Sequence, residues 1–208
     1  QSAIQHCQLR QCRVLVALSG GPDSVALLHL LVRTRERLQL DLYVAHIVHD
    51  MRADSGQDAD FCDQLAKKLT LPIFIETVAV RNRAASKKES LETAARTLRY
   101  RALENIAREQ GCAHIVLAHT QDDQSETILH HLTRGSGLRG VGGMKFRQGL
   151  KTRPLLTVSK QALLNFLDSH ALPYCVDETN RDVSFTRNRI RHVVIPHLEE
   201  NLNPSVQS

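Results

Sequence analysis

The chain has 208 residues, of which 42% are hydrophobic and 24% are charged, and its formal net charge is +5. This composition excludes a disordered or fibrous protein, and the length suffices to bury a full hydrophobic core. No apolar run approaches the roughly 20 residues that cross a bilayer, and residues 1–10 lack the apolar stretch of a signal peptide. We therefore expect a cytoplasmic protein that is not embedded in a membrane.

Apolar strands and helices alternate along the chain. The strands are short continuous apolar runs, whereas the apolar residues of the helices recur at helical spacing. This alternation predicts an α/β fold, in which a parallel sheet carries helices on both faces and a helical extension follows at the C-terminus. In chain order, we expect a strand at 13–18, a helix at 25–37, a strand at 42–48, a helix at 55–69, a strand at 73–80, a helix at 90–110, a strand at 114–118 and helices at 122–134, 159–170 and 186–200.

Three polar loops follow predicted strands, at residues 19–24, 46–55 and 119–126. Since the strands are parallel, all three loops lie at the carboxyl edge of the sheet. Ligands bind at that edge in open α/β folds. We therefore expect the functional site to lie between these loops.

The most specific motif is the hexapeptide between the first strand and the first helix. Its two glycines allow the backbone to approach an anion closely, and its proline suits the first turn of a helix. Free amides, two serine hydroxyls and the positive end of the helix favour phosphate. The aspartate would repel phosphate unless a cation lay between them, which predicts Mg²⁺. The motif comprises Ser19, Gly20, Gly21, Pro22, Asp23 and Ser24, without the lysine of a Walker loop.

A second polar group begins at the end of the fourth strand. Asp122 and Glu126 lie four positions apart at a helix start and share a face. Carboxylates beside a phosphate-binding loop are expected to bind Mg²⁺ directly or through water. His119 could donate to a phosphate or to developing negative charge, and His46 is expected to shape a nucleotide pocket. The structural alternatives are an acidic helix start that the dipole favours and a buried histidine at a strand end.

Positive charge is concentrated in two segments. Residues 81–108 hold eight Arg and Lys against three Glu, and residues 145–192 hold nine against four acids. Two basic segments favour a polyanionic partner such as nucleic acid, with a solvated helix face as the alternative. Aromatic residues make up 4% of the chain and Trp is absent, so a base-stacking platform is not expected.

The hexapeptide has the form found in PP-loop ATP pyrophosphatases, and from Val14 to Pro204 the chain resembles the catalytic domain of the tRNA(Ile)-lysidine synthetase family. Each further motif is weak alone, but their number and order make the resemblance specific. The motifs are H-I-V-H-D-M-R at 46–52, E-x-x-A-R-x-x-R-Y at 92–100, A-H-T-Q-D-D-Q-S-E-T at 118–127, R-G-S-G at 134–137, R-P-L-L at 153–156, D-E-T-N at 177–180 and R-N-R-I-R at 187–191.

The resemblance implies an ATP-dependent ligase that modifies RNA. ATP would adenylate the C2 oxygen of the wobble cytidine in an isoleucine tRNA with a CAU anticodon, and the ε-amine of L-lysine would then displace AMP to give lysidine. The basic segments would hold the anticodon stem-loop by its phosphates. The residues expected to act are Asp23, His119, Arg99 and Asp123 in catalysis, Ser19, Gly20, Gly21, Pro22, Asp23, Ser24 and His46 on ATP, and Asp23, Asp122 and Glu126 on Mg²⁺.

Arg99 is the residue of this set that rests on the resemblance alone. It is expected to contact a phosphate or the activated base. Arg96 lies three positions earlier on the same predicted helix and could share its face, whereas Arg101 points elsewhere. An exposed, ion-paired arginine is the alternative.

Two other functions remain open. A PP-loop tRNA thiolase usually needs paired cysteines for sulfur or an iron–sulfur cluster, and the five cysteines here include no C-x-x-C pair, which also argues against disulfides and structural zinc. A nucleotide-binding regulatory domain would not need clustered carboxylates or two basic segments.

The domain organisation follows from the resemblance. We expect a PP-loop ATP-binding catalytic domain at 1–145 and a mostly helical extension at 146–208. In most members of the family, further C-terminal tRNA-binding domains follow this extension. Whether the chain forms a homodimer is left open.

Two segments carry motifs of less certain meaning. Residues 135–140 match the dinucleotide fingerprint G-x-G-x-x-G, but they follow a helix and not a strand, so we reject that interpretation and expect a loop near the active edge. Residues 177–191 are too polar for a core and are expected to close the site or contact substrate, with a solvated linker as the alternative.

Overall fold

A computed structural model describes residues 6–50, 55–135, 142–176 and 186–203. Six strands form one sheet in the order β3-β2-β1-β4-β6-β5. The predicted parallel sheet is confirmed, and only the edge strand β5 runs antiparallel to its neighbour. The strands are β1 (Cys12–Ala17), β2 (Leu40–His49), β3 (Ile73–Val78), β4 (His114–Val116), β5 (Arg147–Gln148) and β6 (Lys151–Thr152).

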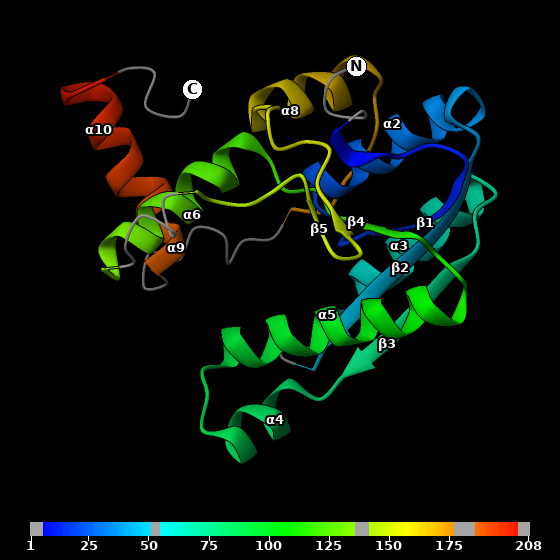
Figure 1. Cartoon of the computed structure of the whole chain (residues 1–208), viewed down its shortest axis with the longest axis horizontal. Coiled ribbons are helices and arrows are strands. Elements are labelled where there is room, and N and C mark those ends of the chain that lie inside the picture. Colours follow the sequence, from blue (N-terminus) through cyan, green and yellow to red (C-terminus); the bar gives the residue numbers. More distant parts are fainter. Residues whose placement is uncertain (1–5, 51–54, 136–141, 177–185, 204–208) are drawn as a thin grey trace.

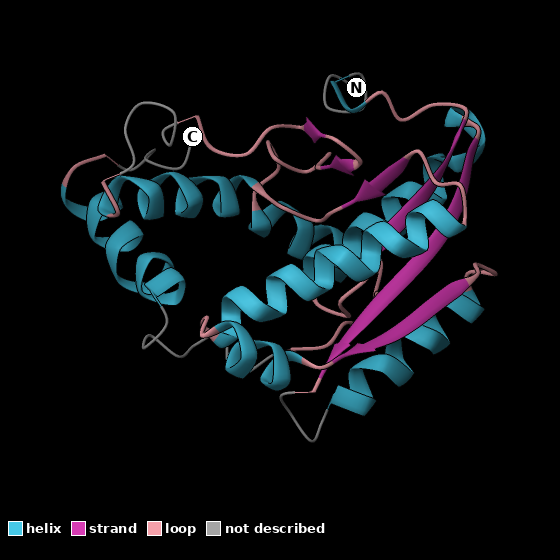
Figure 2. Ribbon diagram, turned by 60° about the horizontal axis from the view of Figure 1, so that its bottom comes forward, coloured by secondary structure: helices cyan, strands magenta, loops and turns pink. Residues whose placement is uncertain are grey.

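Helices cover both faces of the sheet (Figure 1, Figure 2). On one face lie α2 (Pro22–Leu38), α3 (Ser55–Lys68) and α8 (Lys160–Ser169). The other face is covered by α5 (Leu91–Glu109), beside which α4 (Val80–Lys87) packs. A further group lies together at the left of Figure 1 and consists of α6 (Gln121–Thr133), α9 (Thr186–Arg189), the π-helical turn η2 (Ile190–Val194) and α10 (Ile195–Asn201).

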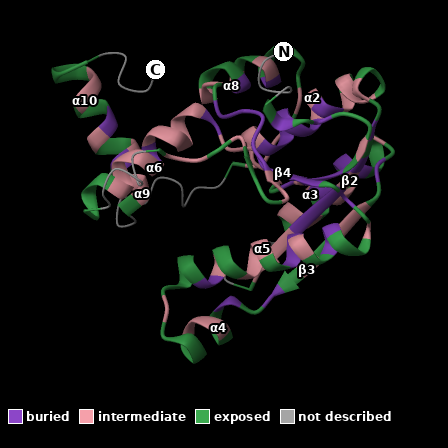
Figure 3. Cartoon of the chain, viewed as in Figure 1, coloured by how far each residue is buried: buried purple, intermediate pink, exposed green. Residues whose placement is uncertain are grey.

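The core lies on both sides of β1 because alternate residues of a strand point to opposite faces. Val14 and Val16 pack with the apolar residues of α2, α3 and α8, whereas Leu15 packs against α5. All three side chains are fully buried, and burial is concentrated in the strands and the helix faces that contact them (Figure 3). A strand that is buried on both faces needs a continuous apolar run, which is the pattern that the sequence shows.

Three short elements differ from the sequence-based expectation. The helix α4 occupies a basic segment in which only Val80 is buried, so no apolar periodicity marks it. The strands β5 and β6 have two residues each, too few to show a pattern, and β6 is held by pairing with β4. They extend the sheet into residues 147–152, while the expected domain division at residue 145 stays a prediction. None of the described helices is long and apolar enough to cross a membrane.

Candidate functional site

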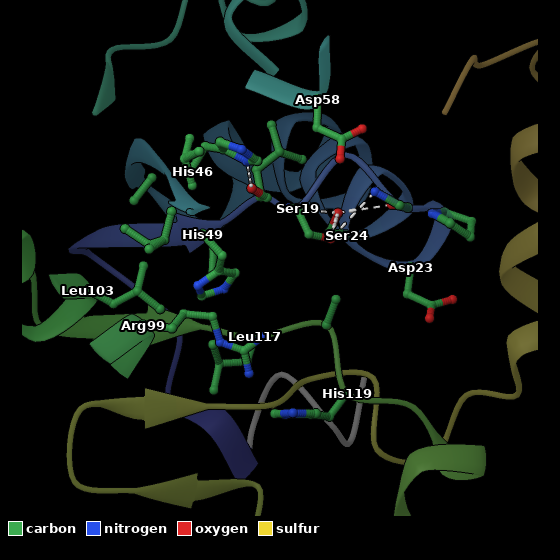
Figure 4. Close-up of a pocket in the computed structure, with 18 of the residues that line it drawn as sticks. Ser19, Asp23, Ser24, His46, His49, Asp58, Arg99, Leu103, Leu117 and His119 are labelled. Carbon is green, nitrogen blue, oxygen red and sulfur yellow. Dashed lines mark hydrogen bonds between the residues drawn. The ribbon is translucent and has the colours of Figure 1, made fainter. Parts of the chain in front are cut away.

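A cavity of about 470 Å³ lies at the carboxyl edge of the sheet. Its walls come from the loop after β1, the end of β2 and the loop after β4, which are the three loops that the parallel order predicted (Figure 4). Three basic side chains also line it: Arg99 from α5, Lys160 from α8 and Arg191 from η2. Its size is that of a small-molecule site, and polar and charged side chains are prominent in its walls.

The hexapeptide at 19–24 forms the turn from β1 into α2. Gly21 is the N-cap residue and Pro22 opens the helix, as predicted. The Ser24 hydroxyl donates to the Gly21 carbonyl over 2.9 Å and accepts from the Ser19 amide over 3.1 Å. The Ser19 and Ser24 hydroxyls lie 3.1 Å apart. Two hydroxyl groups therefore gather at a helix N-terminus, where the helix dipole favours an anion.

The backbone of this turn favours glycine at Gly20. Its φ is +87°, a conformation that side chains with a Cβ rarely adopt. Sγ of Cys175 and Sγ of Cys62 lie close to this glycine, at ordinary contact distance from where a Cβ would stand. The Gly20 carbonyl accepts a hydrogen bond of 2.9 Å from the Cys175 amide. The segment after α8 thus packs directly against the phosphate-binding turn.

Asp23 lies in the first turn of α2 and faces the cavity (Figure 4). Its Oδ1 atom is buried and has no hydrogen-bond partner among the described residues, whereas Oδ2 lies 3.8 Å from Nζ of Lys160. Burial raises the pKa of Asp23, and the Lys160 ammonium opposes that rise. A buried carboxylate oxygen without a partner fits a hard cation such as Mg²⁺.

The other two predicted Mg²⁺ ligands already have protein partners. Asp122 Oδ2 accepts a hydrogen bond of 2.8 Å from the Lys160 amide, which satisfies a free N–H in the first turn of α8. Glu126 is 1% exposed, and its two oxygens accept from Arg187 and Arg191. Within the described part of the chain, no three His, Cys, Asp or Glu side chains gather where they could hold a metal. Asp122 nevertheless lies near enough to Asp23 for its charge to raise the pKa of Asp23. Asp23 has the free oxygen that a cation needs, and the Mg²⁺ roles of Asp122 and Glu126 stay predictions.

Asp123, a predicted catalytic residue, connects α6 to the C-terminal helices. Its Oδ2 accepts from the Thr120 amide over 2.9 Å, and Thr120 Oγ1 accepts from the Asp123 amide over 3.3 Å, which forms a capping box. Its Oδ1 lies 3.2 Å from Arg187 and 3.4 Å from Arg191. Burial alone would raise the pKa of Asp123, but the arginines and the Thr120 amide outweigh burial and lower it. Asp123 is thus an ionised carboxylate with a structural role, and its part in catalysis stays a prediction.

Arg99 lines the cavity from α5. Its Nε atom is buried without a hydrogen-bond partner in the part of the chain that the structure describes. The guanidinium carbons of Arg96 and Arg99 lie 5.0 and 5.2 Å from the ring centroid of Tyr100, so the two arginines do share a face. A buried guanidinium donor that lacks a partner favours an anionic ligand over the alternative of an exposed ion pair.

Two histidines complete the predicted set. His46 is 5% exposed, and its Nδ1 donates to the Leu18 carbonyl over 2.8 Å, which ties the end of β2 to the phosphate-binding turn. His119 follows β4 and lines the cavity (Figure 4). Burial lowers the pKa of His119; Asp123 opposes this effect, and Arg153, Arg99 and Arg187 add to it. The His119 ring is therefore neutral at pH 7.

The lowered pKa of His119 predicts that acid destabilises the fold. The unfolded chain binds a proton on this ring near pH 6.5, about the ordinary value, and the folded chain does not. The neutral His119 ring therefore makes its full contribution to stability above about pH 6.5. This contribution falls as the pH drops toward the pKa that His119 has in the folded chain. Between about pH 7.5 and 5.5 we expect His119 to lower the free energy of unfolding by about 1 kcal/mol. Urea unfolding of the wild type and His119→Gln at both pH values measures this difference, and equal losses in the two proteins would contradict it.

Two polar residues of the cavity were not predicted. Asp58 lines the cavity from α3 (Figure 4). Lys160 opens α8 and connects three elements, because its amide donates to Asp122 and its ammonium approaches Asp23. No local pattern marks either residue, since the fold brings them to the cavity from distant parts of the chain. The predicted motifs at 135–140 and 177–191 lie mostly outside the described residues; only Gly135 and 186–191 are described.

The phosphate-binding turn at the carboxyl edge of a parallel sheet defines a nucleotide-binding domain of the PP-loop class. The PP-loop domain family model matches residues 1–198, and the chain belongs to this family of ATP-binding domains. A tRNA(Ile)-lysidine synthase from Clostridium perfringens is 37% identical over 196 residues, which cover 93% of this chain and 42% of that protein. One from Geobacter sulfurreducens is 42% identical over 199 residues, covering 94% and 42% respectively. The chain thus spans less than half the length of these relatives.

Solved structures show the same fold. The U34-tRNA thiolase NcsA from Methanococcus maripaludis, with its [4Fe-4S] cluster, superposes with a TM-score of 0.78 at 15% identity and covers 99% of this chain and 73% of that one. An NH3-dependent NAD synthetase from Campylobacter jejuni gives 0.55 at 16% identity, with 99% and 84% coverage. At such low identity the similarity establishes the architecture and carries no conclusion about the reaction.

Proposed function

We propose that this chain is the catalytic domain of a cytoplasmic tRNA(Ile)-lysidine synthase. In the proposed reaction, ATP adenylates the C2 oxygen of the wobble cytidine in an isoleucine tRNA with a CAU anticodon and pyrophosphate leaves. The ε-amine of L-lysine then attacks C2 and displaces AMP. The observation that carries the proposal is 37% to 42% identity to proteins of this name across more than nine-tenths of the chain, including every wall of the cavity.

The phosphate-binding turn would hold the triphosphate of ATP. Its amides, the Ser19 and Ser24 hydroxyls and the N-terminus of α2 lie at one end of the cavity. Asp23 would hold Mg²⁺ through its buried Oδ1 atom, and the ion would neutralise charge on the phosphates. His46 and Asp58 line the same cavity and would contact the nucleoside (Figure 4).

Catalysis would depend on position and charge, because ATP itself activates the oxygen. Arg99 would donate through its unpartnered Nε to a phosphate oxygen or to the activated base. His119 would donate to negative charge that develops beside it. A covalent bond to the protein is not needed, since holding tRNA, ATP and lysine in one cavity already makes each step effectively unimolecular.

The tRNA would be held by basic side chains beside the cavity. Arg96 and Arg101 are exposed on α5, and Lys87 and Lys88 are exposed at the end of α4. Contacts of these side chains with the anticodon stem-loop would be phosphate contacts, which position the RNA without reading its sequence.

Mass analysis of nucleosides tests the proposal. The protein in its longest natural form is incubated with Mg·ATP, lysine and an isoleucine tRNA with a CAU anticodon, and an unmodified methionine tRNA serves as the control. Because the C2 oxygen leaves with AMP, we expect cytidine to gain the mass of lysine less one water, only in the isoleucine tRNA and with release of pyrophosphate. If no such gain occurs although ATP binds, the proposal is wrong.

The same assay decides between the proposal and its two alternatives. A tRNA thiolase would exchange an oxygen of a nucleoside for sulfur and so change its mass by the difference between the two atoms. A regulatory domain would bind ATP without release of pyrophosphate. The identity to the lysidine synthases favours lysine transfer over both.

A further inference from the structure

A buried arginine binds one ring nitrogen of His119. Arg153 directly follows β6, which runs parallel to β4, so both residues lie at the carboxyl edge of the sheet. Arg153 is 4% exposed. Its Nε donates to Nδ1 of His119 over 3.2 Å, and its Nη1 donates to the Lys145 carbonyl over 2.9 Å. The Arg153 amide donates to the Phe146 carbonyl over 2.8 Å. Side chain and backbone of Arg153 are thus both fixed by the segment before β5.

This hydrogen bond determines which nitrogen of His119 carries the proton. A guanidinium is a donor only and keeps its protons at any physiological pH. Nδ1 of His119 must therefore be the acceptor and carry no proton. A neutral imidazole has a single N–H, which then lies on Nε2. The lone pair of Nδ1 is used by Arg153, and Nε2 has none to offer, so the His119 ring has a donor for a ligand but no acceptor.

The charged groups around His119 oppose a second proton on its ring. They come from four places: Arg99 on α5, Asp123 on α6, Arg153 after β6 and Arg187 on α9. Asp123 favours a protonated ring, but it is itself bound to Arg187 over 3.2 Å. The three arginines and burial act in the other direction. The ring is therefore held neutral from several sides as well as oriented from one.

We propose that Arg153 is a positioning residue that fixes His119 as a neutral ring with its proton on Nε2. His119 then acts as a hydrogen-bond donor to negative charge on the substrate, and it is not the base that removes a proton from the lysine ammonium. The assignment of the proton stands on the geometry of these two residues. The use of that proton in catalysis rests on the proposed function.

Nitrogen NMR of the full chain labelled with ¹⁵N-histidine measures the tautomer directly. The variant His119→Gln identifies the signals of this ring. We expect Nδ1 to be unprotonated, Nε2 to be protonated and neither signal to titrate between about pH 5.5 and 8. A proton on Nδ1, or a ring that titrates near pH 6.5, would overturn the proposal. This measurement needs no substrate, so its result is independent of the reaction.

Three variants then test the role of Arg153. In Arg153→Met we expect the ring to stay neutral but to become a mixture of its two tautomers, and kcat for lysidine formation to fall about 10-fold, while KM for ATP changes less than about twofold. Arg153→Lys keeps a cationic donor and should restore part of the rate and of the tautomer. Arg37→Met removes an exposed arginine in the last turn of α2, outside both basic segments, and should behave as the wild type.

The outcomes separate this inference from the proposed function. A fall in kcat in Arg153→Met with an unchanged tautomer would overturn the positioning role. If Arg153→Met does not fold, the wild-type spectrum alone decides where the proton lies. If the wild type forms no lysidine, the proposed function is wrong, but the tautomer assignment is unaffected. If the wild type forms lysidine and its His119 titrates, the tautomer assignment is wrong, but the proposed function is unaffected.

Discussion

Asp23→Asn is expected to reduce lysidine formation by about 100-fold or more, the range seen when a group that stabilises charge at a reacting centre is removed. The carboxylate lies at the N-terminus of α2 with its Oδ1 buried and without a partner among the described residues. The asparagine side chain has the same shape but no negative charge, so it would bind Mg²⁺ beside the phosphates far more weakly. Initial rates of lysidine formation at saturating ATP, measured by mass analysis of the tRNA nucleosides, give the size of the effect.

Asp41→Asn is the matched control for this experiment. Asp41 is an exposed aspartate on β2 that lies 3.3 Å from Arg13, and it is not among the residues that line the cavity. Its rate should remain within twofold of the wild type, since exposed ion pairs contribute about 0 to 1 kcal/mol. Comparable rates for Asp23→Asn and the wild type would show that Asp23 has no role in the reaction.

Glu126→Gln is expected to lower the free energy of unfolding by about 3 kcal/mol, the low end of the range for breaking a buried ion pair. Glu126 is 1% exposed and accepts hydrogen bonds from Arg187 over 2.8 Å and from Arg191 over 2.5 Å. Without the charge of Glu126, Asp123 would be the carboxylate left to balance the two arginines on α9 and η2. The side chains of Arg187 and Arg191 are 34% and 25% exposed, so water partly solvates their charges. We therefore expect a loss of stability at the low end of the range. Urea unfolding followed by circular dichroism measures the change.

Glu104→Gln provides the comparison for Glu126→Gln. Glu104 also binds two cations, Lys151 over 2.7 Å and Arg108 over 3.8 Å, but it is 31% exposed on α5. We expect a change below about 1 kcal/mol. Similar changes in the two variants would mean that burial does not set the strength of the Glu126 contacts.

Much of the fold could be predicted from the sequence because burial leaves a periodic signal. β1 is buried on both faces and shows a continuous apolar run, and α5 packs one face on the sheet and shows helical spacing. The predicted ends of both elements agree with the structure to within one residue. Elements without that signal were missed: α4 buries only Val80, and β6 is a strand because β4 pairs with it.

The candidate site could be predicted where one short segment holds several of its groups. The turn at 19–24 has this property, since two glycines, a proline and a helix start fix the positions of Ser19, Asp23 and Ser24. Carboxylates do not reveal their partners in the same way. Asp122 and Glu126 have the spacing of two ligands on one helix face, yet the first caps α8 and the second binds arginines from α9 and η2. Those partners lie far along the chain, and no spacing rule connects them.

One carboxylate of this set has a consequence for mutagenesis. Asp123 completes the capping box of α6 with one oxygen and binds Arg187 and Arg191 with the other. An alanine scan of the acids around the cavity would therefore rank Asp123 beside Asp23 as essential, even if its contacts were its whole role. Loss of the contacts of Asp123 would lower the amount of enzyme that a cell accumulates, whereas loss of Asp23, or of the predicted catalytic role of Asp123, would lower the turnover of each molecule. Protein abundance and specific activity, recorded side by side, distinguish the two.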